Sequence, residues 1–369
     1  MSQIPRHHRQ MLLPGIGESG QAAIAATHVL VVGCGALGSV VTDQLARAGV
    51  GELTLLDRDV VEATNLQRQT LYIERDVTSG TPKAEAAARR VREIDGSLIV
   101  HPVVEHLGTE NVIELLRGVD LVIDGLDNFP TRYLLNDACV REGVPWIYGG
   151  AVATGGMSMP ILPTGRSAAS ARDAAITWNE DASTPCLRCI FPEAPPPGST
   201  PTCDTAGVLA AAVATVSSHQ VAQAIKLMVG AIDALDRDLV SWDLWANTQR
   251  RMTLDSARRV DCPCCAQRLF PHLEAASEEQ AVTLCGRNAV QIVPGGGSVT
   301  LDLAELAQRL QPHGDFLLGN GTLRGTIRGL EGDSGEAVEL MIFPDGRAII
   351  TGSPEPEFAR STYARFIGQ

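Results

Sequence analysis

Short apolar runs alternate with longer amphipathic segments over the first 150 or so residues of the chain. Residues 28–32 form an apolar run, residues 36–48 carry apolar side chains at helical intervals, and residues 52–56 form a second apolar run. This order predicts a strand, a helix and a second strand. Because a helical crossover of this length joins parallel strands, the two strands should pair in parallel.

The same alternation continues as far as residue 148. Further helices are expected at 83–94, 110–116 and 131–142, and further strands at 98–104, 120–124 and 144–148. Strands that alternate with helices pack into one sheet that is covered on both faces. We therefore predict an α/β fold with a doubly wound, mostly parallel, Rossmann-like sheet.

The pattern changes after residue 151. Prolines are frequent from residue 163 to residue 203, so this stretch should be an irregular excursion across the surface. A core-packed helix is expected next at 207–229, followed by strands near 239–244 and 251–254.

A polar boundary at residues 272–279 separates this part of the chain from a second pattern of short strands. The expected strands lie at 281–285, 290–293, 316–318, 323–327, 339–343 and 348–351, with helices near 303–310 and 357–366. We predict a small α+β domain here, and hence two domains, 1–273 and 277–369.

Composition and charge exclude several classes of protein. The chain has 369 residues and a formal net charge of −13, which argues against nucleic acid as a partner. The N-terminus lacks the apolar segment of a secretory signal, and the longest apolar run, residues 206–216, is too short to cross a membrane. We therefore expect a cytoplasmic protein with no membrane segment. Nine cysteines are too few and too odd in number for a disulfide scaffold.

A glycine-rich turn follows the first predicted strand. Gly33, Gly35 and Gly38 form a G-x-G-x-x-G pattern that opens the next helix, where backbone N–H groups can bind a phosphate. Asp57 ends the second strand, where a carboxylate accepts hydrogen bonds from ribose. This pattern predicts an adenosine ligand, with nicotinamide dehydrogenases and other adenosine binders both still open.

A polar cluster follows Asp57 and narrows this choice. Its members are Asp57, Asp59, Asn65, Arg68, Gln69 and Lys83. A bound dinucleotide needs no such concentration of cations, because its two phosphates are never broken. A triphosphate attacked at its α-phosphorus does need them, because negative charge builds on the transferring group and on pyrophosphate.

In combination, these features resemble the E1-like activating enzymes of the ThiF/MoeB/HesA type. The resemblance covers about residues 1–270 and rests on an ordered set of motifs: Arg6-His-His-Arg9-Gln10, the glycine turn, Leu-Leu-Asp57-Arg-Asp59, Asn65-Leu-Gln-Arg68-Gln69, Thr81-Pro-Lys83, Asp124-Gly-Leu-Asp127-Asn128 and paired C-x-x-C motifs. It implies an adenylyltransferase that uses Mg-ATP. The substrate would be the C-terminal glycine of a small ubiquitin-like sulfur-carrier protein of the MoaD or ThiS type, ending in Gly-Gly.

The family pattern also implies roles for single residues. It places Asp57 on the ribose, Asn65, Arg68 and Lys83 on the phosphates with Gln69 assisting, Asp127 on Mg²⁺, and Arg9 on the ATP of the partner subunit in a homodimer. Asp59 and Asn128 complete the set of nucleotide-binding candidates. A helix cap or Asx-turn before Thr131 is the alternative role for Asp127 and Asn128.

The spacing of the cysteines indicates a metal site. Cys186, Cys189, Cys262 and Cys265 form two C-x-x-C pairs, which is typical of a closed, structural Zn²⁺ site. Cys264 leaves the ligand set open, because it could replace a neighbour.

One further cysteine has a possible covalent role. Cys203 precedes the long helix, and in some relatives a cysteine at this position forms a thioester or persulfide, while in others it is dispensable. The remaining cysteines, Cys34, Cys139 and Cys285, are expected to be small core residues.

The prediction as a whole is an ATP-dependent adenylyltransferase with Mg²⁺ and Zn²⁺ as cofactors. The alternatives are an NAD-dependent oxidoreductase and a non-catalytic scaffold that binds a ubiquitin-like protein. The second domain contains Cys285 as its one cysteine, within a predicted strand, so we do not expect it to transfer sulfur.

Overall fold

The computed structural model describes residues 4–164, 176–178, 180–193, 206–274, 280–284, 288–294, 301–319, 321–333 and 335–368. The chain divides into two compact units, Met1–Ala275 and Ala276–Gln369.

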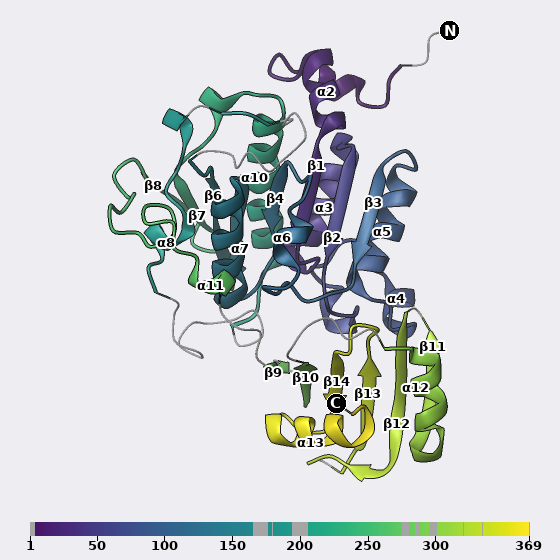
Figure 1. Cartoon of the computed structure of the whole chain (residues 1–369). Helices are drawn as coiled ribbons and strands as arrows, with labels where there is room; N and C mark the ends of the chain where they lie inside the picture. Colours follow the sequence, from purple (N-terminus) through teal and green to yellow (C-terminus); the bar gives the residue numbers. More distant parts are fainter. Residues whose placement is uncertain are drawn as a thin grey trace. The chain divides into compact units, whose positions relative to one another are not determined.

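The first unit is built on one sheet of eight strands in the order β3-β2-β1-β4-β5-β6-β7-β8 (Figure 1). Its strands are β1 His28–Val32, β2 Glu52–Leu56, β3 Ile99–Val103, β4 Leu121–Asp124, β5 Trp146–Val152, β6 Gly155–Ile161, β7 Leu239–Asp243 and β8 Thr248–Met252. The pairs from β3 to β5 are parallel, and those from β5 to β8 are antiparallel. After β1 the chain adds β2 and β3 on one side of this strand and then β4 and β5 on its other side. Doubly wound sheets bind ligands where the strand order reverses in this way.

Helices pack on both faces of this sheet. The helices described in this unit are α1 His8–Met11, α2 Gly17–Ala26, α3 Ala36–Ala48, α4 Glu74–Thr78, α5 Lys83–Ile94, α6 Val112–Leu115, α7 Phe129–Glu142, α8 Leu187–Ile190, α10 Ala210–Met228 and α11 Pro271–Glu274. Alternate residues of β1 belong to different cores: Val29 and Val31 lie in one cluster, and Leu30 and Val32 in another. Both faces of β1 are therefore buried, as expected for a central parallel strand.

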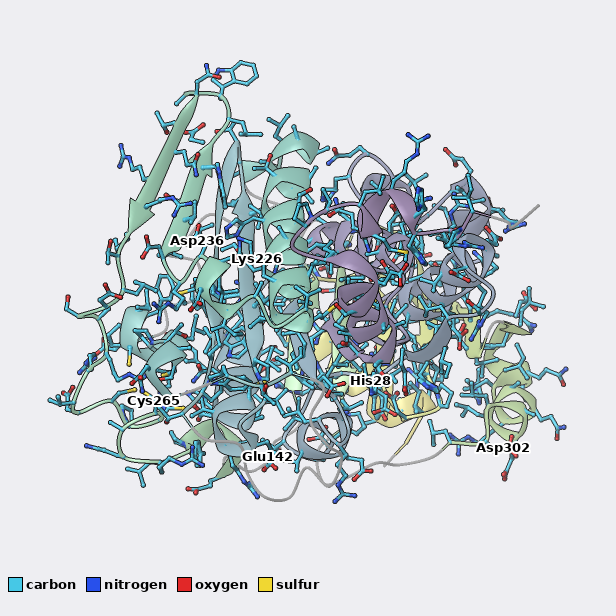
Figure 2. All side chains as sticks on the ribbon, turned by 90° about the horizontal axis from the view of Figure 1, so that it is seen from above. His28, Glu142, Lys226, Asp236, Cys265 and Asp302 are labelled. Atoms are coloured by element: carbon cyan, nitrogen blue, oxygen red, sulfur yellow. The ribbon has the colours of Figure 1, made fainter. Side chains whose placement is uncertain are left out.

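The helix α10 is tied to the segment that leads into β7. The side-chain oxygen Oε1 of Gln223 accepts hydrogen bonds from Lys226 Nζ (3.3 Å) and from the backbone N–H of Asp236 (2.9 Å). Figure 2 shows Lys226 and Asp236 on this part of the unit. Val216 of α10 also packs so closely on β6 that a Cβ atom at Gly156 would lie 2.7 Å from its side chain.

The second unit is a six-stranded antiparallel sheet in the order β11-β12-β13-β14-β10-β9. Its elements are β9 Gln280–Leu284, β10 Ala289–Val293, α12 Leu303–Leu310, β11 Gly314–Gly319, β12 Thr322–Glu331, β13 Ala337–Ile342, β14 Ala348–Thr351 and α13 Pro356–Phe366. Apolar residues of α12 and α13 share one core with the strands, for example Leu306 and Phe366 with Leu340.

The predicted fold class is confirmed for both units. Several details of the prediction were wrong. The helices α2 and α4 were not expected, and α10 begins at Ala210, three residues after the expected start. β6 was not expected, because Gly155, Gly156 and Pro160 are poor strand formers. β8 begins at Thr248, three residues before the expected start. The proline-rich excursion was expected to lack regular structure, yet it contains the short helix α8 and a 3₁₀ turn at Glu180–Ala182.

None of the helices in the described part of the chain combines the length and the apolar character needed to cross a membrane.

Candidate functional site

The glycine turn lies between β1 and α3, and its three glycines have different physical roles. Gly33 has φ +88°, and a Cβ atom there would lie 2.7 Å from the carbonyl oxygen of Gly125. A Cβ atom on Gly38 would overlap the carbonyl oxygen of Gly33. At Gly35, by contrast, the nearest described atom would be Gln69 Nε2 at 3.9 Å. Gly33 and Gly38 are therefore required by the packing of the chain, whereas Gly35 borders open space that a ligand can fill.

This difference leads to a prediction for Gly35→Ala. The added methyl group fits the protein, so the free energy of unfolding should change by about 1 kcal/mol or less. It occupies the space beside the turn where a phosphate would approach, so the KM for ATP should rise at least about tenfold. Gly38→Ala is the control and should destabilise the protein instead. Thermal unfolding and steady-state kinetics separate the two outcomes; an unchanged KM in Gly35→Ala would contradict a phosphate at this turn.

Asp57 connects the end of β2 to the glycine turn. Its Oδ2 accepts a hydrogen bond from the backbone N–H of Cys34, and its Oδ1 accepts one from the N–H of Asp59, both at 2.7 Å. Burial raises the pKa of the Asp57 carboxyl, and the nearby Lys83 ammonium opposes this shift. The structure thus places Asp57 against the glycine turn. The sequence predicts that this carboxylate binds the ribose of the nucleotide.

Lys83, the first residue of α5, is buried among carboxylates. Its Nζ lies 3.0 Å from Asp59 Oδ2, and its backbone N–H donates to the carbonyl oxygen of Asp59 at 2.8 Å. Burial alone lowers the pKa of Lys83, but Asp59 and Asp57, with a smaller contribution from Asp127, raise it above its ordinary value. Lys83 therefore carries a positive charge at neutral pH, and the structure brings Asp57, Asp59, Lys83 and Asp127 into one electrostatic neighbourhood.

The turn after β2 contributes polar atoms that lack partners. Asn65 Oδ1 accepts a hydrogen bond from the Glu62 N–H at 3.2 Å, and Arg68 Nη1 donates to the carbonyl oxygen of Thr64 at 2.9 Å. Among the described residues, Arg68 Nε and Gln69 Oε1 are buried without a hydrogen-bond partner. Buried polar atoms of this kind are costly unless a ligand or water satisfies them. The residues present here therefore fit a polar ligand such as a nucleotide.

Asp127 and Asn128 lie where β4 leads into α7. Asn128 Oδ1 caps the helix by accepting the Thr131 N–H at 3.0 Å, and Asn128 Nδ2 donates to Asp127 Oδ1 at 3.1 Å. The alternative role as a helix cap is thus what the structure shows for Asn128. Asp127 takes no part in the cap and is exposed at the carboxyl edge of the sheet, so its carboxylate fits a hard cation such as Mg²⁺.

Arg9 is not brought to the site of its own chain. The neighbouring Gln10 donates from Nε2 to the carbonyl oxygen of Ala48 at 2.9 Å, and a Cβ atom on Gly49 would lie 2.5 Å from the His7 ring. The segment with Arg9 therefore packs at the C-terminal end of α3, whereas the glycine turn lies at its N-terminal end. A helix of 13 residues separates these ends by about 20 Å.

Sequence reasoning missed two residues that support this site. The Tyr72 hydroxyl donates to the carbonyl oxygen of Cys34 at 2.6 Å and so holds the glycine turn. Arg132 forms a buried ion pair with Asp124 at 2.9 Å, directly beneath the turn that carries Asp127. A signal for Arg132 was present: a charged residue on the buried side of a helix needs a buried partner.

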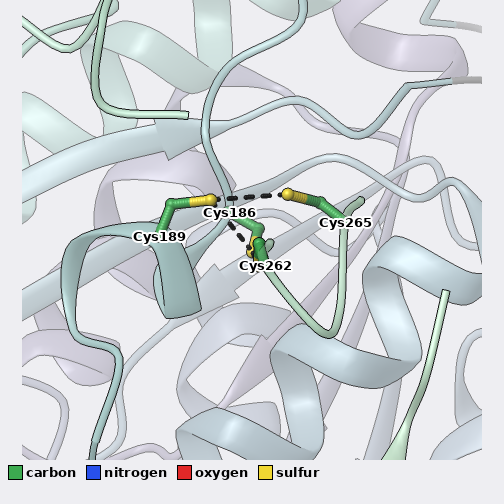
Figure 3. A group of neighbouring side chains, drawn as sticks. All are labelled: Cys186, Cys189, Cys262 and Cys265. Carbon is green, nitrogen blue, oxygen red and sulfur yellow. Dashed lines mark hydrogen bonds between the residues drawn. The ribbon is translucent and has the colours of Figure 1, made fainter. Parts of the chain in front are cut away.

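Four cysteines form one cluster (Figure 3). The sulfur atoms of Cys186, Cys189, Cys262 and Cys265 all lie within 4.8 Å of one another, and three of the separations are 3.4, 3.6 and 4.0 Å. A tetrahedral zinc ion with Zn–S bonds of about 2.3 Å requires sulfurs about 3.8 Å apart. The geometry of the cluster therefore fits zinc.

The remaining cysteines that were singled out lie elsewhere. Cys264 is outside the group of four, and its sulfur accepts a hydrogen bond from Asn136 Nδ2 at 3.2 Å. Cys34 and Cys139 are fully buried in the core, as expected. Cys203 and Cys285 lie outside the described residues.

The fold and these residues define a class of protein: an α/β protein with a glycine turn, a polar cluster at the carboxyl edge of its sheet and a separate four-cysteine cluster. The chain belongs to the ThiF family, which it matches over residues 7–264. The prediction of an E1-like member of this family is confirmed. This membership argues against the oxidoreductase alternative.

Two relatives and one solved structure illustrate the similarity. The chain is 37% identical to the Bacillus subtilis protein named sulfur carrier protein ThiS adenylyltransferase, over 98% of this chain and 99% of that protein. It is 40% identical to the Haloferax volcanii SAMP-activating enzyme E1, over 72% of this chain and 90% of the relative. The crystal structure of E. coli MccB with ATP shares the fold, with a TM-score of 0.56 and 20% identity over 71% of this chain and 74% of that one.

Proposed function

We propose that this protein transfers AMP from ATP to the C-terminal carboxylate of a small sulfur-carrier protein that ends in Gly-Gly, and releases pyrophosphate. The observation that carries this proposal is the 37% identity to a ThiS adenylyltransferase over nearly the full length of both chains. The name of the Haloferax volcanii relative, a SAMP-activating enzyme, points to the same class of substrate. The acyl-adenylate formed in this way activates the carrier for sulfur transfer in a later step.

The residues at the carboxyl edge of the sheet suit this reaction. Asp57 binds the ribose, and Asn65, Arg68 and Lys83, assisted by Gln69, bind the phosphates that approach Gly35. A carrier carboxylate oxygen forms a bond to the α-phosphorus, and the bond from that phosphorus to the pyrophosphate oxygen breaks, with its electron pair leaving on pyrophosphate. No general base is needed, because a carboxylate is already ionised at neutral pH. Positioning and charge stabilisation by Arg68 and Lys83 therefore provide most of the rate enhancement.

Two metal ions complete the proposal. Asp127 holds Mg²⁺, which when bound neutralises charge on the phosphates. The four cysteines hold a structural Zn²⁺, because four thiolates leave no open coordination position for chemistry. Cys203 keeps its predicted, possible covalent role, and the cytoplasmic location also stays a prediction.

The position of Arg9 favours a homodimer. The segment that carries Arg9 packs at the C-terminal end of α3, about 20 Å from the glycine turn of its own chain, which is farther than an arginine side chain reaches. A symmetric dimer can bring the Arg9 of each subunit to the site of the other, because a two-fold interface is reciprocal. Arg9 would then stabilise charge on the phosphates across the interface.

Carrier-dependent exchange of labelled pyrophosphate into ATP tests the function. The wild-type protein should catalyse exchange with a carrier ending in Gly-Gly and not with a carrier lacking these two residues. Asp127→Ala should reduce exchange at least about a hundredfold, because Mg²⁺ is no longer held and the charge on the phosphates is no longer neutralised. Asp43→Ala, which removes a half-buried carboxylate paired with Arg47 on α3, is the matched control and should leave the rate unchanged.

The outcomes separate the candidate functions. A wild-type protein that binds the carrier without any exchange would contradict adenylation and support the non-catalytic scaffold. Exchange retained in Asp127→Ala would contradict only the role of Asp127.

A further inference from the structure

A buried ion pair lies beneath the turn that carries Asp127. Asp124, the last residue of β4, is fully buried, and Arg132 on α7 is 5% exposed. Arg132 Nε lies 2.9 Å from Asp124 Oδ2. Nothing in the reaction described above uses this pair, although Asp127 lies between its two members in the sequence.

The guanidinium holds three parts of the chain at once. Besides the bond to Asp124, Arg132 Nη2 donates to the carbonyl oxygen of Leu126 at 2.5 Å and to that of Gly149 on β5 at 2.7 Å. Its plane is supported by Tyr148 and Phe129, with the guanidinium carbon 5.2 and 5.6 Å from the ring centres. A planar, forked and stacked cation makes these contacts in one fixed orientation.

Leu126 is therefore fixed on both sides of its backbone. Asp124 Oδ1 accepts the Leu126 N–H at 2.8 Å, while Arg132 binds the Leu126 carbonyl oxygen. The N–H of the preceding Gly125 donates to the carbonyl oxygen of Val32 at 2.8 Å. A Cβ atom on Gly125 would overlap the carbonyl oxygen of Gly33. The turn from Asp124 to Leu126 is thus locked against the glycine turn, and Asp127 is the next residue.

We propose that Arg132 is a positioning residue: acting with Asp124, it holds the Asp127 carboxylate at a fixed place relative to the glycine turn, so that a divalent cation bound there meets the phosphates. This inference rests on the proposed function, because it assigns the cation to Asp127. It makes Arg132 a determinant of metal affinity and not a contact of the nucleotide.

A merely structural ion pair makes a different prediction. If the pair only stabilises the fold, its loss should lower the melting temperature and reduce all activities in proportion. If it positions Asp127, the affinity for the cation should fall while the protein remains folded. Metal affinity therefore distinguishes the two roles, and stability alone does not.

Arg132→Lys is the variant that tests the proposal. Lysine keeps the positive charge beside Asp124, so the buried carboxylate stays paired, but one ammonium cannot reproduce the forked bonds to Asp124, Leu126 and Gly149. Arg132→Ala would leave a buried carboxylate unpaired and threaten folding, so it serves only as a comparison. Arg268→Lys is the matched control: Arg268 donates to the carbonyl oxygens of Val140 and Arg141 at the other end of α7 and lies over Phe270.

The measurement is the affinity for Mn²⁺ at saturating ATP, followed by the enhancement of the water-proton relaxation rate when Mn²⁺ binds to the protein, relative to the same mixture of Mn²⁺ and ATP without protein. We expect Arg132→Lys to weaken Mn²⁺ binding at least tenfold, toward the value of Asp127→Asn, and Arg268→Lys to bind like the wild-type protein. In the exchange assay, Arg132→Lys should need at least tenfold more Mg²⁺ for half-maximal rate.

Each other result overturns an identifiable claim. Wild-type Mn²⁺ affinity in a folded Arg132→Lys protein would overturn the positioning role, as would an exchange rate that falls with unchanged Mg²⁺ dependence. A wild-type protein that binds Mn²⁺ and ATP but shows no carrier-dependent exchange would overturn the proposed function while the Mn²⁺ comparison still decides the role of Arg132. Absence of Mn²⁺ binding by the wild-type protein with ATP would overturn both.

Discussion

Two inactive variants should regain activity when they are mixed. Arg9→Ala and Lys83→Ala should each retain less than about 1% of wild-type exchange, because each removes a cation from the phosphates. In a mixed dimer, the site with intact Lys83 receives the intact Arg9 of the other subunit, and this site should be active. The opposite site lacks both residues. Random mixing in equal amounts makes about half of the dimers mixed, each with one of two sites intact, so about a quarter of wild-type activity should return.

Lys83→Ala mixed with Asp127→Ala provides the control for this experiment. Both of these substitutions disable the subunit that carries them, so every site in a mixed dimer stays damaged and no activity should return. Native mass spectrometry should confirm that mixed dimers form in both cases. If Arg9 acts within its own chain, the first mixture also stays inactive, and that result would contradict the role of Arg9 across the interface.

Local patterns explain why the parallel half of the sheet could be predicted from the sequence. Its strands are short, continuous apolar runs, and the intervening helices carry apolar residues at helical intervals, so the signal for each element lies within about a dozen residues. Strand β6, in the antiparallel half, has no such signal. β6 contains two glycines and a proline. It is held by pairing with the adjacent β5 and with β7, which is distant in the sequence. Tertiary pairing overrides propensity there.

The candidate site divides in the same way. The glycines, Asp57, Lys83 and Asp127 could be predicted because they follow strands whose carboxyl ends meet at one edge of the sheet. A charged residue in a helix was the signal for Arg132, but its contacts with Leu126 and Gly149, like that of Tyr72 with Cys34, could not be predicted, because backbone carbonyl groups carry no sequence signature. The different roles of Gly35 and Gly33 also depend on neighbours that only the folded chain brings together, above all Gly125.

The cysteine cluster connects the second half of the first unit to α7. Asn136 of this helix is fully buried; its Oδ1 accepts the Leu187 N–H at 2.9 Å, and its Nδ2 donates to Cys264 at 3.2 Å. Leu187 lies between Cys186 and Cys189, and Cys264 lies between Cys262 and Cys265. One asparagine thus contacts both cysteine pairs, and the N-terminus of the same helix lies beside Asp127.

Loss of the metal should therefore affect both the fold and the reaction. Cys262→Ser should reduce bound zinc from about one ion per chain to almost none, because a structural site needs all four thiolates. Zinc binding contributes directly to folding, so the melting temperature should fall by on the order of 10 °C or more. Carrier-dependent exchange should fall as well, since α7 loses its support at Asn136. Metal analysis, thermal unfolding and the exchange assay measure the three effects.

Cys264→Ser is the matched control, because it makes the same substitution two residues away in a buried cysteine outside the cluster. Its hydroxyl can still accept the hydrogen bond from Asn136, so zinc content and exchange should stay close to wild type, with only a modest loss of stability. The reverse pattern, with zinc retained in Cys262→Ser and lost in Cys264→Ser, would show that Cys264 is the ligand and that the cluster of four is wrongly assigned. Equal loss in both variants would mean that the site depends on packing around Asn136 and not on which sulfur binds the ion.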